Sequence, residues 1–176
     1  FELQYFTDLP DNTGESSLVI IQAAIDLEPG DEIGLFDANG VLESVEAGGT
    51  PEYGYTLVGA GVWTGDQLEI VGVSSVDLSD FGGPVLNGYV AGNPIVYKVW
   101  KSVEDAEYSA TADHSSGGDW GDVLTVVSLL EPIFSITQDI TLNPFTFNMT
   151  SFNVLPEDQN IESVFDSLDE IKFGEE

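Results

Sequence analysis

The 176-residue chain contains no cysteine and no arginine, and only three lysines and one histidine accompany its 32 acidic residues. The absence of cysteine excludes disulfides, zinc–thiolate sites and thiol catalysis. Without arginine and with so few lysines, the chain cannot replace the counterions of nucleic acid or bind phosphate through paired donors. We therefore expect neither nucleic acid nor an anionic membrane surface as a partner.

Long hydrophobic runs are also absent. No apolar stretch approaches the roughly 20 residues that a membrane-spanning helix needs, so membrane insertion is not expected. The chain begins at Phe1 rather than Met, which predicts either a removed leader or a longer precursor. Its hydrophobic content of 42% and aromatic content of 11% are sufficient for a folded core. We expect one domain with an appendage.

The net charge of −29 has two interpretations. A dense layer of carboxylates keeps a protein soluble in salty water, where dissolved ions screen the repulsion between them. Alternatively, some carboxylates cluster to bind Ca²⁺, the one cofactor that the composition suggests. We favour the solubilising interpretation.

Alternation of apolar and polar residues predicts that most of the chain is made of short strands. The clearest stretch is 55–73, YTLVGAGVWTGDQLEIVGV, which predicts a hairpin closed by Gly65-Asp66. Residues 74–93 lack periodicity and predict a long loop. Such strands, with turns every ~8 to 12 residues, are typical of an antiparallel β-sandwich or jelly roll, which we assign to residues 1–142. The other predicted strands are 1–7, 17–25 (buried on both faces), 32–37, 41–45, 94–102, 106–112, 123–131 and 134–140.

Residues 143–176 follow a different pattern and predict a C-terminal extension. Within Asn143–Leu155 the apolar positions shift by one residue, which predicts a bulge or a strand that passes to another subunit. Farther along, apolar residues at helical spacing predict one short helix, whose apolar stripe needs a cover. The residues expected to contact another subunit are Phe145, Phe147, Met149, Phe152, Val154, Val164 and Phe165.

Four segments carry a resemblance to a known class of protein. They are GDEIGLFDANG (30–40), LVGAGVWTGD (57–66), LNGYVAGNPIVYKVW (86–100) and EYSATADHSSG (107–117). Together they resemble a β-sandwich module of large secreted or cell-surface proteins of gliding bacteria with type IX-like export. The tail FNMTSFNVLPEDQNIESVFDSLDEI (147–171) is similar to the opening of a second module that often follows it. The resemblance implies an extracellular or cell-surface location and a role in adhesion or assembly.

Few residues suggest chemistry. Asp37 and Asn39 have the alternate spacing of a Ca²⁺-binding loop, although Asp-Ala-Asn-Gly is also a plain hairpin turn, which we favour. Trp120 lies in a glycine-rich loop and is the tryptophan expected to contact a glycan. Trp63 and Trp100 lie in strand patterns and are expected in the core.

The remaining motifs have simple structural explanations or concern modification. His114 stands beside two serines, but adjacent residues rarely form a catalytic triad, so we expect an ordinary loop histidine. Gly59-Ala60-Gly61 is expected to allow close strand packing rather than dinucleotide binding. Asn148 begins an N-glycosylation sequon, and Ser167 lies in an Asp-Ser-Leu triplet like the O-glycosylation acceptor of the bacteria named above.

Three hypotheses of function follow. The favoured one is a non-enzymatic extracellular structural protein, a subunit of a surface fibre or adhesin that binds copies of itself by strand donation. The donated strand would be Asn143–Leu155 or Phe1–Thr7. The second is a Ca²⁺-dependent carbohydrate-binding module. The third is a glycoside hydrolase with a pair of acids. We favour a protein without enzymatic activity because the sequence shows no catalytic or cofactor-binding signature.

Overall fold

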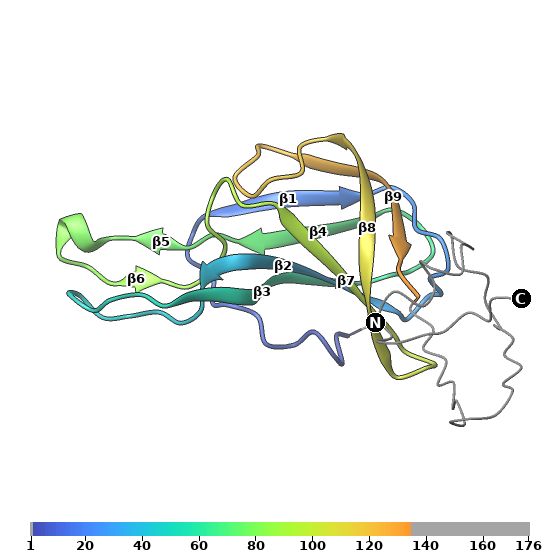
Figure 1. Ribbon diagram of the computed structural model, residues 1–176, viewed down its shortest axis with the longest axis horizontal. Coiled ribbons are helices and arrows are strands. Elements are labelled where there is room, and N and C mark those ends of the chain that lie inside the picture. Colours follow the sequence, from blue (N-terminus) through green and yellow to red (C-terminus); the bar gives the residue numbers. More distant parts are fainter. Residues whose placement is uncertain (1, 135–176) are drawn as a thin grey trace, which may run out of the picture. The chain divides into compact units, whose positions relative to one another are not determined.

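A computed structural model describes residues 2–134 (Figure 1). These residues belong to one unit, which ends at Phe134. The predicted domain boundary at 142, the strand predicted to end at 140, and the strand and helix of the extension all lie outside the described residues. No helix in the described part is long and apolar enough to cross a membrane.

Strands are the main regular secondary structure of residues 2–134, as the sequence predicts, and they are joined by turns, loops and one 3₁₀ turn. Seven strands form one sheet in the order β3-β2-β7-β8-β9-β1-β4, and β5 pairs with β6 separately. The large sheet is mixed rather than wholly antiparallel, because β1 runs parallel to β9. The elements are β1 (Ser16–Ile21), β2 (Glu32–Val41), β3 (Tyr53–Val62), β4 (Leu68–Val73), β5 (Val76–Asp77), the 3₁₀ turn η1 (Ser79–Phe81), β6 (Val85–Leu86), β7 (Ile95–Lys101), β8 (Ala106–Ser116) and β9 (Thr125–Pro132).

The core lies on one face of this sheet. Alternate residues of the strands supply it, including Val19 of β1, Leu35 of β2, Val99 of β7 and Val127 of β9, each fully buried. In β1 only every second side chain is fully buried, so the prediction of a strand buried on both faces is wrong. Seven further strands were predicted outside the hairpin at 55–73. Four of them exist as strands in the structure, as β2, β7, β8 and β9.

The predicted hairpin at 55–73 exists as two strands, β3 and β4, but they do not pair with each other. Instead β3 pairs with β2 and β4 pairs with β1, so β3 and β4 form the two ends of the sheet. They still pack closely: a Cβ atom on Gly59 would lie 2.7 Å from the backbone oxygen of Val71. The prediction of close strand packing at these glycines is confirmed, whereas the hydrogen-bonded hairpin is wrong.

Asp37 to Gly40 were predicted to make a tight turn, and that prediction is also wrong. β2 continues through them to Val41, with an irregularity in its register opposite β3 between Asp37 and Gly40. Gly40 serves close packing here, since a Cβ on it would lie 2.8 Å from the backbone oxygen of Gly88. The glycine is needed for space rather than for a positive φ angle.

The stretch 74–93, predicted to be a long loop, contains two short strands and a 3₁₀ turn. β5 and β6 form a hairpin around η1. Val85 of this hairpin exchanges two backbone hydrogen bonds with Val45, in the loop between β2 and β3. The two loops thus form one projection, which we call the hairpin arm (residues 42–52 and 76–87; Figure 1, left). Phe81 on this arm is 90% exposed.

Candidate functional site

The buried acidic residues are the first chemical feature of the described domain. Glu32 is 1% exposed although it begins a strand. Its two carboxylate oxygens accept hydrogen bonds from the backbone N–H groups of Gln4, Tyr5 and Phe6, the last at 2.9 Å. Residues 4–6 form no strand, so the strand predicted at 1–7 is wrong. Glu32 holds this segment through its side chain instead.

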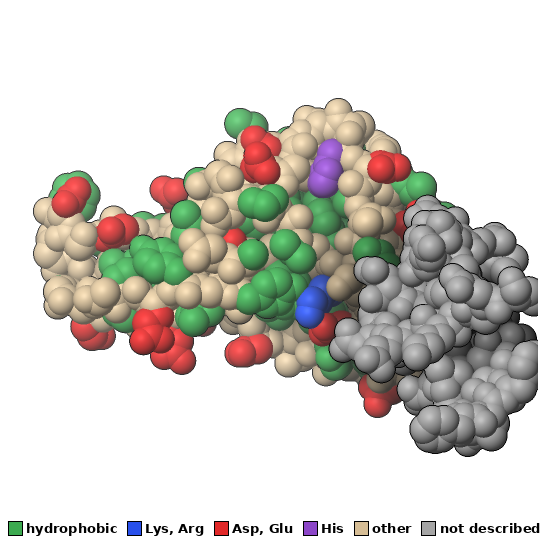
Figure 2. All heavy atoms as spheres, in the orientation of Figure 1, with side chains coloured by type: hydrophobic (Ala, Val, Ile, Leu, Met, Phe, Trp, Pro, Cys, Tyr) green, Lys and Arg blue, Asp and Glu red, His purple; other side chains and the backbone are tan. Residues whose placement is uncertain are grey.

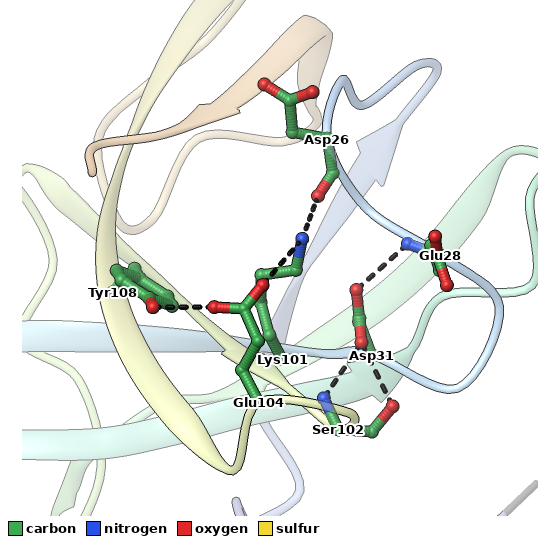
Figure 3. A network of polar contacts seen from close by, with 7 residues as sticks. All are labelled: Asp26, Glu28, Asp31, Lys101, Ser102, Glu104 and Tyr108. Carbon is green, nitrogen blue, oxygen red and sulfur yellow. Dashed lines mark hydrogen bonds and ion pairs between the residues drawn. The ribbon is translucent and has the colours of Figure 1, made fainter.

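Asp31, the residue directly before β2, holds two other segments together in the same way. It is 1% exposed and accepts hydrogen bonds from the backbone N–H of Glu28 and from the N–H and hydroxyl of Ser102, at 2.9 to 3.1 Å. Figure 3 shows this carboxylate between the two segments that it joins. Close by, Lys101 donates to the backbone oxygen of Asp26 at 2.8 Å and pairs with Glu104 at 3.5 Å.

Asp37 makes the third attachment, and its surroundings argue against the calcium site predicted for Asp37 and Asn39. Its side chain is fully buried. Its oxygens accept hydrogen bonds from the N–H groups of Asn39 and Val90, at 2.8 and 2.7 Å, and from the Asn93 amide. N–H donors therefore occupy the positions that a cation would take, and Asn39 contributes a backbone N–H rather than an oxygen ligand. The described contacts of Asp37 and Asn39 therefore do not fit the calcium-site alternative. No cluster of three or more metal-ligating side chains occurs within residues 2–134.

Trp120, predicted to contact a glycan, is buried at 1% exposure. Its ring stacks on Tyr89 with the centroids 4.5 Å apart, and its Nε1–H donates to the backbone oxygen of Phe36 at 3.2 Å. It also lies directly against Gly72, which has no side chain to exclude it. The prediction of surface contact is therefore wrong. Trp63, predicted to lie in the core, is buried there at 4% exposure. Trp100 is also buried, at 7% exposure, but in a separate smaller cluster with Phe6 and Phe36.

The only histidine, His114, lies on β8 and is exposed. Its Nε2 is 2.9 Å from the hydroxyl of Tyr97, whose side chain is 3% exposed. No serine hydroxyl is hydrogen-bonded to His114 in the described structure, and the hydroxyl of the neighbouring Ser115 contacts the backbone oxygen of Val126. His114 therefore anchors a buried phenol at the edge of the core.

Burial of Tyr97 predicts that the protein loses stability in alkaline solution. Burial raises the pKa of the Tyr97 phenol well above its ordinary value of 10.0, so the folded protein keeps this proton where the unfolded chain releases it. The unfolded state then binds fewer protons, and the free energy of unfolding falls as the pH rises above about 10. Urea unfolding at pH 8, 10 and 11 should show this fall, and Tyr97→Phe should make it shallower. Tyr53→Phe, at an exposed tyrosine, is the control. Equal slopes for Tyr97→Phe and the unaltered protein would contradict this explanation.

Aromatic residues gather on the face of the sheet opposite the core. Phe36 of β2 and Trp100 of β7 are nearly buried there, at 8% and 7% exposure, and each is covered by a tyrosine that is almost half exposed. Tyr5 stacks on Trp100 with ring planes 3° apart, and Tyr55 stacks on Phe36 with planes 19° apart. We call this surface the aromatic face; its members are Tyr5, Phe36, Tyr55, Lys98, Trp100 and Glu107.

Lys98 supplies the positive charge of the aromatic face. Its Nζ lies 5.3 Å from the ring centre of Phe36 and 5.1 Å from that of Tyr55, within the range of a cation–π contact. It also forms an ion pair with Glu107 at 2.6 Å, and the hydrogen bond to Glu107 raises the pKa of the lysine. In the space-filling view, lysine atoms lie beside a group of hydrophobic side chains on the visible face (Figure 2).

An open groove of about 610 Å³ lies elsewhere on the described domain. Its buried wall contains the hydroxyls of Ser17 and Tyr89, 2.7 Å apart, which satisfy each other. Two carboxylates, Glu15 and Asp122, also line it, and Asp122 accepts a hydrogen bond from the N–H of Asp119 at 3.1 Å. A smaller pocket of about 340 Å³ is lined by residues of the hairpin arm, including Leu42 and Glu52.

The remaining predicted site residues lie outside the described residues. They are the glycosylation candidates Asn148 and Ser167 and the residues expected to contact another subunit, Phe145, Phe147, Met149, Phe152, Val154, Val164 and Phe165. The three buried carboxylates that hold distant segments and the aromatic face were not predicted from the sequence. Lysines among aromatic residues in PIVYKVWKS (94–102) were the available signal for that face.

Comparisons with known proteins assign no family. No protein-family model matches the chain, no curated protein matches it, and no solved structure matches it. The resemblance to modules of gliding bacteria therefore stays a prediction.

Proposed function

We propose that the chain is a non-enzymatic extracellular structural protein, a subunit of a surface fibre or a module of an adhesin that associates with copies of itself by strand donation. The observation that carries the proposal is the open sheet. β3 and β4 end the sheet, and neither has a second strand partner within residues 2–134. An edge strand presents unpaired backbone N–H and C=O groups that can pair with a strand of another chain.

Of the two edge strands, β3 is the better partner for an incoming strand. The part of β3 that can accept it is the first half of the strand. Around Gly59 and Gly61 the strand is covered by β4, whose side chains Ile70 and Leu68 lie within 3.2 Å of a Cβ built on these glycines. Tyr53 and Tyr55, by contrast, are about half exposed. We propose that a donated strand pairs here, and that the curled sheet corresponds to the two layers of a sandwich, with β3-β2-β7 in one layer and β9-β1-β4 in the other.

The hydrogen bonds of the buried carboxylates favour a structural role for the protein over an enzymatic one. A glycoside hydrolase needs two carboxyl groups roughly 5 to 10 Å apart that are free to exchange protons with the substrate. Asp31, Glu32 and Asp37 instead accept backbone hydrogen bonds from segments distant in the sequence. Carboxylates used in this way fix the chain in one conformation, as expected of a structural module.

Removal of the extension tests the proposal. We expect purified 1–176 to sediment as assemblies whose size grows with protein concentration, and the variant lacking 143–176 to sediment as a single folded species. Loss of assembly is also expected for Phe147→Asp, because a charge would be buried in the contact. A variant lacking only 172–176 keeps the predicted strand and helix and serves as the control, so it should assemble. Assembly that survives the removal of 143–176 would contradict strand donation from this segment.

A further inference from the structure

We infer that the aromatic face binds a neutral carbohydrate chain, with Tyr5 and Tyr55 stacking on two of its sugar rings. This inference does not rest on self-assembly, because the residues that carry it all lie within the described domain. It also differs from a calcium-dependent lectin site, since the carboxylates concerned do not form a cation site.

The first argument is the geometry of the two tyrosines. One side of each ring lies on a buried aromatic ring, and the exposed fractions are 45% for Tyr5 and 46% for Tyr55. Their rotamers are therefore fixed before a ligand arrives, so little conformational entropy is lost on binding. The C–H groups on the face of a sugar ring can pack on such an aromatic surface, whose electrostatic potential is negative above the ring.

The second argument is the set of polar groups between the tyrosines. Lys98 and Glu107 place an ammonium donor and carboxylate acceptors 2.6 Å apart, with side chains 25% and 28% exposed. A sugar hydroxyl both donates and accepts hydrogen bonds, so adjacent hydroxyls match a donor next to an acceptor. The phenol groups add two further partners. Burial raises the pKa of both phenols; Glu107 raises that of Tyr5 further, whereas Lys98 partly lowers that of Tyr55.

Charge selects a neutral ligand over an anionic one. The chain carries a net charge of −29, so its surface repels anionic polysaccharides and acidic proteins. The one cation on the aromatic face is already paired with Glu107, so no unpaired cation is left there, among the described residues, to bind an anionic group. A neutral glycan is not subject to the repulsion that the acidic surface exerts on anions. It can also be bound along a flat sheet face, where a small molecule would find no enclosing pocket.

Affinity electrophoresis tests the inference with defined probes. The protein is run in native gels that contain a neutral polysaccharide, such as dextran, galactomannan, xyloglucan or mixed-linkage β-glucan, or an anionic one such as alginate or polygalacturonate. We expect retardation by at least one neutral polysaccharide and by neither anionic one. Tyr5→Ala and Tyr55→Ala should each weaken the association constant about five- to tenfold, the range expected for loss of one aromatic contact.

Three controls separate stacking from loss of structure. Tyr5→Phe and Tyr55→Phe keep the rings and should retain most of the binding. Phe81→Ala removes an aromatic ring that is 90% exposed on the hairpin arm and should bind like the unaltered chain. Unchanged far-ultraviolet circular dichroism and a cooperative urea transition would show that the alanine variants are folded. Retardation by none of the neutral polysaccharides, retardation by the anionic ones alone, or equal binding by the tyrosine-to-alanine variants overturns the inference. Each experiment also runs on the variant lacking 143–176, so failure of assembly and failure of binding are distinguishable.

Discussion

Replacing Trp120 with alanine is expected to lower the free energy of unfolding by about 3 to 5 kcal/mol, the usual cost of deleting a buried tryptophan side chain. The ring is 1% exposed and packs between Tyr89 and Gly72, so its loss leaves a cavity that the neighbouring strands cannot fill. The substitution also removes the hydrogen bond from Nε1–H to the backbone oxygen of Phe36. Urea unfolding followed by far-ultraviolet circular dichroism measures the effect.

Trp120→Phe separates these two contributions. A phenyl ring keeps part of the stacking on Tyr89 but cannot donate to Phe36, so we expect a smaller loss of about 1 to 2 kcal/mol. If Trp120→Ala is as stable as the unaltered protein, the loop that carries Trp120 does not pack as described. Such a result would also reopen the interpretation of this tryptophan as a surface residue.

Replacing Glu32 with alanine is expected to cost about 2 to 4 kcal/mol and to release the N-terminal segment. Hydrogen bonds to a charged acceptor contribute more than neutral ones, and this carboxylate accepts three of them from Gln4, Tyr5 and Phe6. Part of the loss is offset because water can reach the freed N–H groups of the exposed residues. Limited proteolysis should cleave the variant within residues 4–9 and leave the sheet intact.

The exposed Glu2 provides the matched control for this substitution. Glu2→Ala removes a nearby carboxylate that is not buried, so its stability and cleavage pattern should match those of the unaltered chain. Cleavage of Glu32→Ala at the rate of Glu2→Ala would show that Phe6 alone, buried against Phe36, holds the segment. The Tyr5 ring would then stay on Trp100 without the help of Glu32.

The strands were predictable because their signal is local. Alternation in IVYKVWK and TVVSLLEP locates β7 and β9 within two residues, since one face of each strand packs on the core. Which strands pair with each other could not be predicted from such local patterns. Gly65-Asp66 between β3 and β4 is typical of a hairpin, yet the same short turn lets the chain pass to the opposite end of the sheet. Pairing depends on contacts with β1 and β2, which lie far away in the sequence.

The buried polar groups were not predictable, for a related reason. A carboxylate in a strongly acidic sequence is expected at the surface, and nothing local distinguishes Glu32 or Asp37 from the exposed acids around them. Their partners lie 26 and 53 positions away at Phe6 and Val90. Asp-Ala-Asn-Gly was interpreted as a hairpin turn, with a calcium loop as the alternative, because a turn, a calcium loop and an irregular strand share these residue types.

Negative-stain electron microscopy of the purified chain 1–176 is the most direct test of the central claim, that this domain is a structural unit which polymerises. We expect filaments of uniform width at physiological salt concentration, where the repulsion arising from a net charge of −29 is screened over about 8 Å. Dispersed single particles at every protein concentration and salt strength would contradict it.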